Sequence, residues 1–170
     1  MSCKTTPGGQ LWRRLLLWLP AAGWYAVIFL FSAQTGVESG TISDRLAIDL
    51  LRLETDAPWT LSEVQYAFFQ LVTFLLRKGA HMAVYFVLTA CLALALRGLL
   101  SSPRRQAVCV LGLCAVLAAL DELHQYFVPG RSCQLRDVVI DTLGGLCFLL
   151  LWAGVRAIKR RRARKKAAVA

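Results

Sequence analysis

Residues 107–131 read AVCVLGLCAVLAALDELHQYFVPGR, and this stretch decides the fold. An apolar run from Ala107 to Leu120 leads directly into the polar group DELHQ at 121–125. An ionised side chain in hydrocarbon costs about 2.5–3.5 kcal/mol or more, so a helix entering a bilayer must turn such residues toward protein or water. Asp121, His124 and Gln125 are spaced i, i+3 and i+4, which places them on one helix face. The stretch therefore predicts one wall of a polar site within a helical membrane protein.

The composition of the whole chain favours the same class. Of its 170 residues, 57% are hydrophobic, and the mean hydropathy is +0.54, which is far more apolar than a soluble domain. Four apolar stretches approach the roughly 20 residues that a bilayer requires. They lie at Leu15–Ala33, Gly79–Leu96, Ala107–Phe127 and Val138–Ile158. We therefore predict an all-α, polytopic membrane protein with four transmembrane helices, comprising a transmembrane domain over residues 1–158 and a basic tail over residues 159–170.

The connection between the first two spans, Gln34–Lys78, is too apolar for a plain loop. Ser43 is suited to cap a short helix in which Leu46, Leu50 and Leu53 share one face. That pattern is typical of a helix lying on a membrane surface.

A second helix is predicted in the same connection, because Thr60-Leu61-Ser62-Glu63 has the spacing of a capping box. A helix running unbroken from Leu61 to Leu100 would be about 60 Å long, twice the hydrocarbon thickness. We therefore expect a break or bend near Arg77-Lys78-Gly79, which would give one or two interfacial or re-entrant helices before the second span.

The net charge of +10 is distributed unevenly between the two ends of the spans. The N-terminus, the second connection and the tail together hold 14 basic residues and no acidic ones, whereas the other side holds six basic and all ten acidic residues. The positive-inside rule then predicts that both termini are cytoplasmic. The basic run 160–166 is a topology determinant that favours anionic lipid headgroups, so membrane lipids are the expected partner and nucleic acid is not.

Further polar residues stand at the same ends of the other spans. Lys78, His81 and Tyr85 share one helix face, and Asp137 and Asp141 lie one turn apart at the start of the last span. Gly144-Gly145 follows, and such small residues allow close helix approach. The topology brings these groups to the outer side. The candidate site residues are Gln34, Lys78, His81, Tyr85, Asp121, Glu122, His124, Gln125, Arg131, Asp137 and Asp141.

Each of these residues also has a structural interpretation. Lys78 and Arg131 could extend to the interface as long basic side chains do, and Asp137 could cap the last span. His81 could form an interhelical hydrogen bond. The combination favours a site, because clusters of ionisable groups at membrane depth usually mark one.

Four pieces of the chain together resemble the VanZ-like family of small bacterial membrane proteins. They are FSAQ at 31–34, RKGAH at 77–81 followed by Tyr85, DELHQYFVPGR at 121–131 and RDVVIDTLGG at 136–145, in the family's order. One departure is Val84, which stands where many relatives carry Glu. The resemblance implies a multi-pass protein of the bacterial cell membrane. It also implies a link to the cell envelope and to antibiotic resistance, because the founding member is associated with resistance to teicoplanin. The family's pattern falls on the candidate residues named above.

Three functions are open. The first is a non-transporting protein whose outer pocket binds an anionic or lipid-linked envelope ligand, such as a lipoglycopeptide, with Arg131 gripping a carboxylate or phosphate. The second is a membrane enzyme in which His124 acts as general base, oriented by Asp121 beside Glu122, on a phosphate- or acyl-bearing lipid. The third is a proton-coupled transport component, for which four spans are few without oligomerisation. The zinc motif HExxH and a Gly-rich phosphate loop are absent from the sequence, so neither a metal nor a cofactor is expected.

Overall fold

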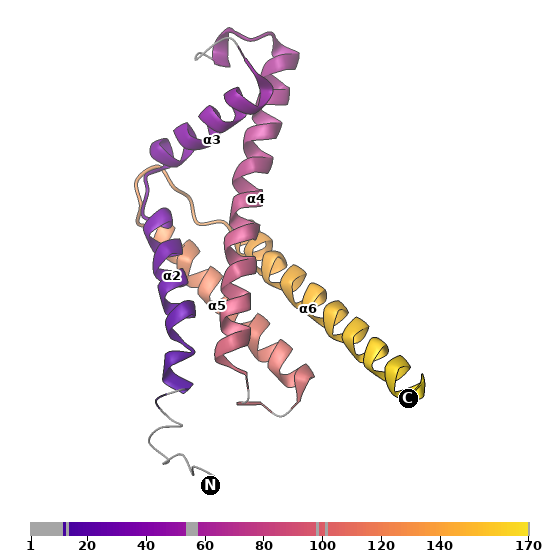
Figure 1. Cartoon of the computed structure of the whole chain (residues 1–170). Helices are drawn as coiled ribbons and strands as arrows, with labels where there is room; N and C mark the ends of the chain where they lie inside the picture. The colour runs from indigo at the N-terminus through magenta and orange to yellow at the C-terminus, as the bar shows by residue number, and fades with distance from the viewer. Residues whose placement is uncertain (1–11, 13, 54–57, 98, 101, 170) are drawn as a thin grey trace.

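The computed structural model describes residues 12, 14–53, 58–97, 99–100 and 102–169, and these form an all-α fold without strands (Figure 1). The elements are α2 (Leu19–Ser32), α3 (Gly36–Leu51), a short 3-10 turn η1 (Pro58–Thr60), α4 (Glu63–Ala95), α5 (Pro103–Gln125) and α6 (Leu135–Val169). Among the described residues, four helices are long and apolar enough to cross a membrane. The first is Arg14–Ser32, which includes α2, and the others are α4, α5 and α6. The predicted fold class is confirmed.

Helix α4 is the centre of the bundle. It packs against α2, α3, α5 and α6, while α5 and α6 also pack on each other. The fully buried side chains Tyr85, Leu88 and Leu92 of α4 meet Val110 and Cys114 of α5 in the core. Many apolar side chains on the outside of the bundle are exposed, as helices that face lipid require.

Two aromatic residues fasten α2 to this core. The Trp24 indole N–H donates to the Val84 carbonyl of α4 at 2.8 Å, and the Tyr25 hydroxyl donates to the Leu117 carbonyl of α5 at 3.3 Å. Such contacts are favoured where water is scarce, because an unpaired polar group in a membrane is costly. They fix the middle of α2 against the middle of α4, close to Tyr85, and against α5 one turn before Asp121.

Helix α3 begins seven residues earlier than its expected cap. Thr35, not Ser43, caps it: the Thr35 hydroxyl accepts from the Glu38 N–H, and the Glu38 carboxylate accepts from the Thr35 N–H. These hydrogen bonds lower the pKa of Glu38. Ser43 lies inside the helix, where its hydroxyl donates to the Ser39 carbonyl. The expected cap was wrong because Thr35-Gly36-Val37-Glu38 is itself a capping-box sequence.

Two other expectations about α3 and α4 need correction. Helix α3 ends at Leu51, with Arg52 in the left-handed region at φ 51°, so Leu53 is outside the helix face that Leu46 and Leu50 share. Helix α4 is capped by Ser62 and Gln65, and not by the Thr60 and Glu63 pair.

The break expected near Arg77-Lys78-Gly79 is also wrong, because α4 is continuous from Glu63 to Ala95. A single Gly costs a helix only about 1 kcal/mol, and α4 contains no Pro. Packing of α3 and α6 against α4 offsets that small cost. The first half of α4 therefore projects beyond the bundle beside α3 (Figure 1).

Helix α6 continues through the basic residues to Val169, so the secondary structure does not change at residue 158. In Figure 1 the start of α2 and the end of α6 lie at the lower end of the bundle. The end of α2, the end of α5 and the start of α6 lie at the other end, which we call the polar end because its helix ends carry Ser32, Gln125 and Asp137.

Candidate functional site

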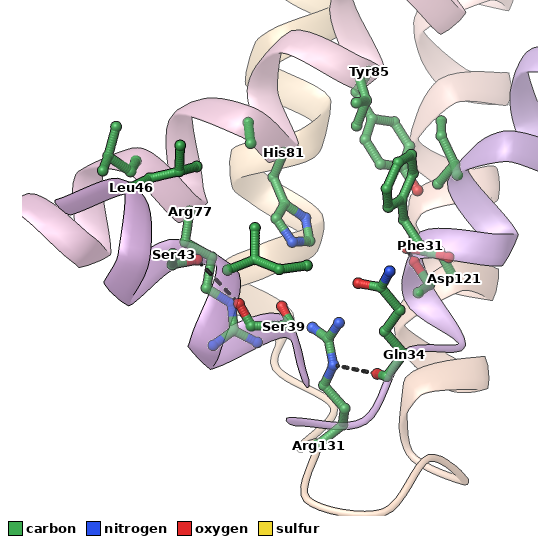
Figure 2. Close-up of a pocket in the computed structure, with 16 residues that line it drawn as sticks. Phe31, Gln34, Ser39, Ser43, Leu46, Arg77, His81, Tyr85, Asp121 and Arg131 are labelled. Carbon is green, nitrogen blue, oxygen red and sulfur yellow. Dashed lines mark hydrogen bonds between the residues drawn. The ribbon is translucent and has the colours of Figure 1, made fainter. Parts of the chain in front are cut away.

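A cavity of about 430 Å³ opens at the polar end between α2, α3, α4, the end of α5 and the loop that follows it. Its walls are largely apolar: Ile28 and Phe31 come from α2, Ile42 and Leu46 from α3, and Leu76 from α4. Polar side chains gather on the rest of its surface (Figure 2). They are Ser32, Gln34, Ser39, Ser43, Arg77, His81, Tyr85, Asp121 and Arg131.

Asp121 holds the ends of α2 and α5 together at one side of the cavity. It is 1% exposed, and its Oδ2 accepts from the Ser32 hydroxyl at 2.9 Å and from the Gln125 side-chain amide at 3.1 Å. Its Oδ1 has no hydrogen-bond partner among the described residues, and neither does the hydroxyl of the neighbouring cavity residue Tyr85. Asp121 and Gln125 are therefore buried side by side, whereas His124, which was expected on the same wall, stacks on Phe29.

Arg131 is placed by a tight turn between α5 and α6. Gly130 adopts φ +73°, a backbone conformation that favours glycine, and the Gly36 N–H donates to the preceding Pro129 carbonyl at 3.1 Å. A Cβ on Gly36 would collide with the Gly130 carbonyl oxygen, so the start of α3 rests directly on this turn. The Arg131 Nε donates to the Gln34 carbonyl at 3.2 Å, and Nη1 donates to the Gln125 side-chain oxygen at 3.4 Å.

Arg77 is a cavity residue that the sequence reasoning missed. It lies on α4 one turn before His81 and two turns before Tyr85, and all three line the cavity. The spacing i, i+4 and i+8 is a helix face, so the sequence contained the signal. The predicted face instead contained Lys78, His81 and Tyr85. Of these three, Lys78 does not line the cavity.

Two pairs of ionisable side chains join α4 to α6. Lys78 Nζ lies 2.6 Å from Asp137 Oδ2, with exposed side-chain fractions of 14% and 12%. One turn further on, His81 Nδ1 lies 3.3 Å from Asp141 Oδ1, and the Asp141 side chain is fully buried. His81 thus lines the cavity on one side and contacts Asp141 on the other. Lys78, Asp137 and Asp141 position α4 and α6 and do not line the cavity.

Glu122 and His124 also lie outside the cavity lining. Glu122 is buried and its Oε2 accepts from the Gln134 N–H at 2.9 Å, which ties the α5–α6 loop to α5. The His124 ring stacks on Phe29 of α2 with centroids 4.2 Å apart, and the described residues provide no hydrogen bond between His124 and Asp121.

A comparison with protein-family models matches residues 17–158 to the family described as VanZ/LLP1. The chain belongs to the VanZ/LLP1 family. No curated protein and no solved structure matches the chain. Family membership and the four apolar helices together make it a multi-pass membrane protein of the VanZ-like type.

The four VanZ-like motifs meet at one end of this VanZ/LLP1 protein. FSAQ supplies Ser32 and Gln34, RKGAH supplies Arg77 and His81, and DELHQYFVPGR supplies Asp121 and Arg131 to the cavity. RDVVIDTLGG supplies the acidic partners Asp137 and Asp141 of α6. Val84, where many relatives carry Glu, lines the cavity with an apolar side chain.

The cavity of this VanZ/LLP1 protein combines largely apolar walls with a few polar side chains. Within the described part of the chain, no group of three or more His, Cys, Asp or Glu side chains could hold a metal. Two guanidinium groups face the same cavity as a single carboxylate, Asp121. Apolar walls with a few convergent polar groups are typical of small-molecule sites.

Proposed function

We propose that this VanZ-like membrane protein binds an anionic or lipid-linked envelope ligand in the cavity at its polar end. The observation that supports this most is the combination of apolar walls with the Arg77 and Arg131 guanidinium groups in one cavity. The walls suit an acyl or prenyl chain, and the guanidinium groups suit the anionic group attached to it. The volume lies in the range of ordinary ligand sites.

We further propose that this cavity faces the outer leaflet. The polar end lies opposite the end of α6 that carries the basic residues 159–166 (Figure 1). If the basic end is cytoplasmic, as the positive-inside rule favours, the cavity opens outward. Ligands at that depth would be envelope amphiphiles or drugs that insert into the outer leaflet.

Tolerance of teicoplanin is the finer part of the proposal. Teicoplanin carries an acyl chain, and each buried methylene contributes about 0.8 kcal/mol to membrane association. A cavity with apolar walls could therefore distinguish a lipidated glycopeptide, or the envelope lipid that it contacts, from vancomycin. Expression in a susceptible Gram-positive host should raise tolerance to teicoplanin more than to vancomycin, and equal protection against both drugs would contradict this part.

The enzymatic alternative has less support. The proposed general base, His124, stacks on Phe29 outside the cavity lining, and Asp121 bonds to Ser32 and Gln125 instead of orienting His124. The substitution His124→Ala distinguishes the two functions. A binding protein should keep its function in that variant, whereas the enzyme should lose it entirely.

Binding itself can be tested with a photoactivatable fatty-acyl lipid in proteoliposomes. Ala80 lines the cavity, and Ala83 lies on an exposed part of the same helix outside it. Ala80→Trp should fill the cavity and lower cross-linking to its walls several-fold, while Ala83→Trp should leave cross-linking unchanged. The proposal fails if the lipid cross-links to Ile42 and Leu46 as strongly in both variants as in the parent protein.

A further inference from the structure

We propose that Arg77 and Arg131 form a paired clamp for one phosphate group, so that the cavity selects amphiphiles with a phosphate headgroup. This inference rests on the proposed function and names the ligand chemistry of the same cavity. Arg77 comes from α4, and Arg131 comes from the α5–α6 loop, so two separate elements would close on the ligand.

Arg77 carries a positive charge into the cavity without an acidic partner. Within the described part of the chain it forms no hydrogen bond or ion pair, although it is only partly exposed. Its neighbour Lys78 points to Asp137 and is fully paired at 2.6 Å. A guanidinium group has five N–H donors, so all five of Arg77 are free for a ligand.

Arg131 has unused N–H donors and lies near the positive charge of Arg77. Two of its N–H groups go to neutral acceptors, the Gln34 carbonyl and the Gln125 side-chain oxygen, which leaves three. Burial lowers the pKa of Arg131 and the nearby positive charge of Arg77 lowers it further, whereas the carboxylates of Asp121, Glu122 and Asp137 raise it. An anion between the two guanidinium groups would relieve both effects.

Asp121 is the one carboxylate among the described residues that line the cavity, and one of its two oxygens is already hydrogen-bonded. Asp121 accepts from Ser32 and Gln125 through Oδ2. In Figure 2 it lies beside Tyr85 and Phe31, whereas the guanidinium groups of Arg77 and Arg131 approach Ser39 from two sides. The cavity thus has a cationic region, formed by Arg77 and Arg131, and one carboxylate, Asp121, whose charge also acts on Arg131.

A phosphomonoester fits the cationic region better than a carboxylate does. It carries close to two negative charges near neutral pH and three acceptor oxygens, which match two guanidinium groups. A carboxylate has one charge and two oxygens, and it would leave one arginine uncompensated. The apolar walls formed by Ile42, Leu46 and Leu76 begin beside the same region and suit the attached chain.

The test measures binding of the purified full-length protein in a phosphate-free detergent. The probes are fluorescent phosphatidic acid, diacylglycerol with the same chains, and inorganic phosphate as competitor. Phosphatidic acid should bind at least about tenfold more tightly than diacylglycerol. Arg77→Ala and Arg131→Ala should each weaken phosphatidic acid binding about tenfold and leave diacylglycerol binding unchanged. The double variant should lose less than the product of the single losses, because both side chains bind one group.

Two further variants sharpen the result. Arg77→Lys keeps the charge but not the planar fork, so it should recover part of the lost affinity. Arg45→Ala removes the same charge from the exposed side of α3 outside the cavity and should change nothing.

Each outcome has a distinct meaning. Equal binding of phosphatidic acid and diacylglycerol, or equal effects of Arg77→Ala and Arg45→Ala, would overturn the clamp while leaving amphiphile binding intact. Failure of both lipids to bind would defeat the proposed function itself. If inorganic phosphate competes at a concentration equal to that of the lipid, the clamp is supported with free phosphate as its ligand. If it competes only at much higher concentrations, the clamp is supported with a lipid phosphate as its ligand.

Discussion

Lys78, a basic residue near the polar end of the bundle, is engaged in a pair between two helices. Its ammonium group lies 2.6 Å from Asp137 and 5.9 Å from the centre of the Phe74 ring. Both members of the pair are mostly buried, so loss of one leaves the other uncompensated. Arg77, the preceding residue, has no such partner within the described residues, so adjacent basic residues on one helix have different roles.

We predict that Lys78→Met lowers the free energy of unfolding by about 3 kcal/mol, because it strands the Asp137 carboxylate. Adding Asp137→Leu should recover much of that loss, since the double variant contains no unpaired charge. Thermal unfolding in detergent, followed by helical circular dichroism, measures both. Arg136→Ala is the matched control: Arg136 lies 3.7 Å from Asp137 with a 60% exposed side chain, so its loss should cost under about 1 kcal/mol. Additive losses in the double variant would contradict the pairing.

At the scale of elements, the contact between α4 and α6 depends on glycine. A Cβ on Gly144 would collide with the Met82 backbone carbonyl of α4, and one on Gly145 would meet the Thr89 hydroxyl and the Cys114 sulfur. The two helices therefore approach closely where Lys78 and His81 reach their partners on α6. The close approach that small residues predicted in this segment is present.

Gly144→Ala should lower the free energy of unfolding by about 1–3 kcal/mol, because a backbone carbonyl cannot move aside easily. Gly154→Ala provides the same change on the same helix where a Cβ meets nothing within 4 Å, and it should be neutral or slightly stabilising. The same thermal measurement compares the two variants. Similar midpoints for both would show that α4 and α6 are not in close contact.

At the scale of the whole molecule, basic and polar residues are separated along the bundle. The basic residues of α6 and the polar ends of α2 and α5 lie at opposite ends of the bundle (Figure 1). That separation is the basis for the proposed outward cavity, and the positive-inside rule then predicts a cytoplasmic position for the proposed basic tail, residues 159–170.

A thiol reagent that cannot cross membranes tests this orientation. Cys133 is exposed in the loop at the polar end, so intact cells should show labelling at this residue. Cys3 belongs to the N-terminal segment outside the described residues, and the basic-residue count predicts that it becomes labelled only after the cells are opened. Protection of Cys133 together with labelling of Cys3 in intact cells would invert the topology and place the cavity on the cytoplasmic side.

The sequence by itself determined the fold class, the number of spans and the end of the bundle at which polar residues collect. These properties follow from hydropathy, which is local and additive along the chain. The family resemblance also held, because its motifs are continuous pieces of sequence. The predicted cap of α3 was wrong because two possible caps, Thr35 and Ser43, stand close together in the sequence. The break predicted at Arg77-Lys78-Gly79 was wrong because the expected bilayer thickness was given more weight than the continuous helical pattern.

Only the tertiary structure divided the polar residues into those that line the cavity and those that join neighbouring elements. Asp121, His81, Tyr85 and Arg131 line the cavity, whereas Lys78 and Glu122 hold helices and a loop in place. No sequence pattern predicted that Lys78 would pair with Asp137, 59 residues away, or that Arg77 would have no partner among the described residues. The reason is physical: a helix pattern fixes the angle of a side chain about its own axis, but the rotation and closeness of neighbouring helices decide what that side chain meets.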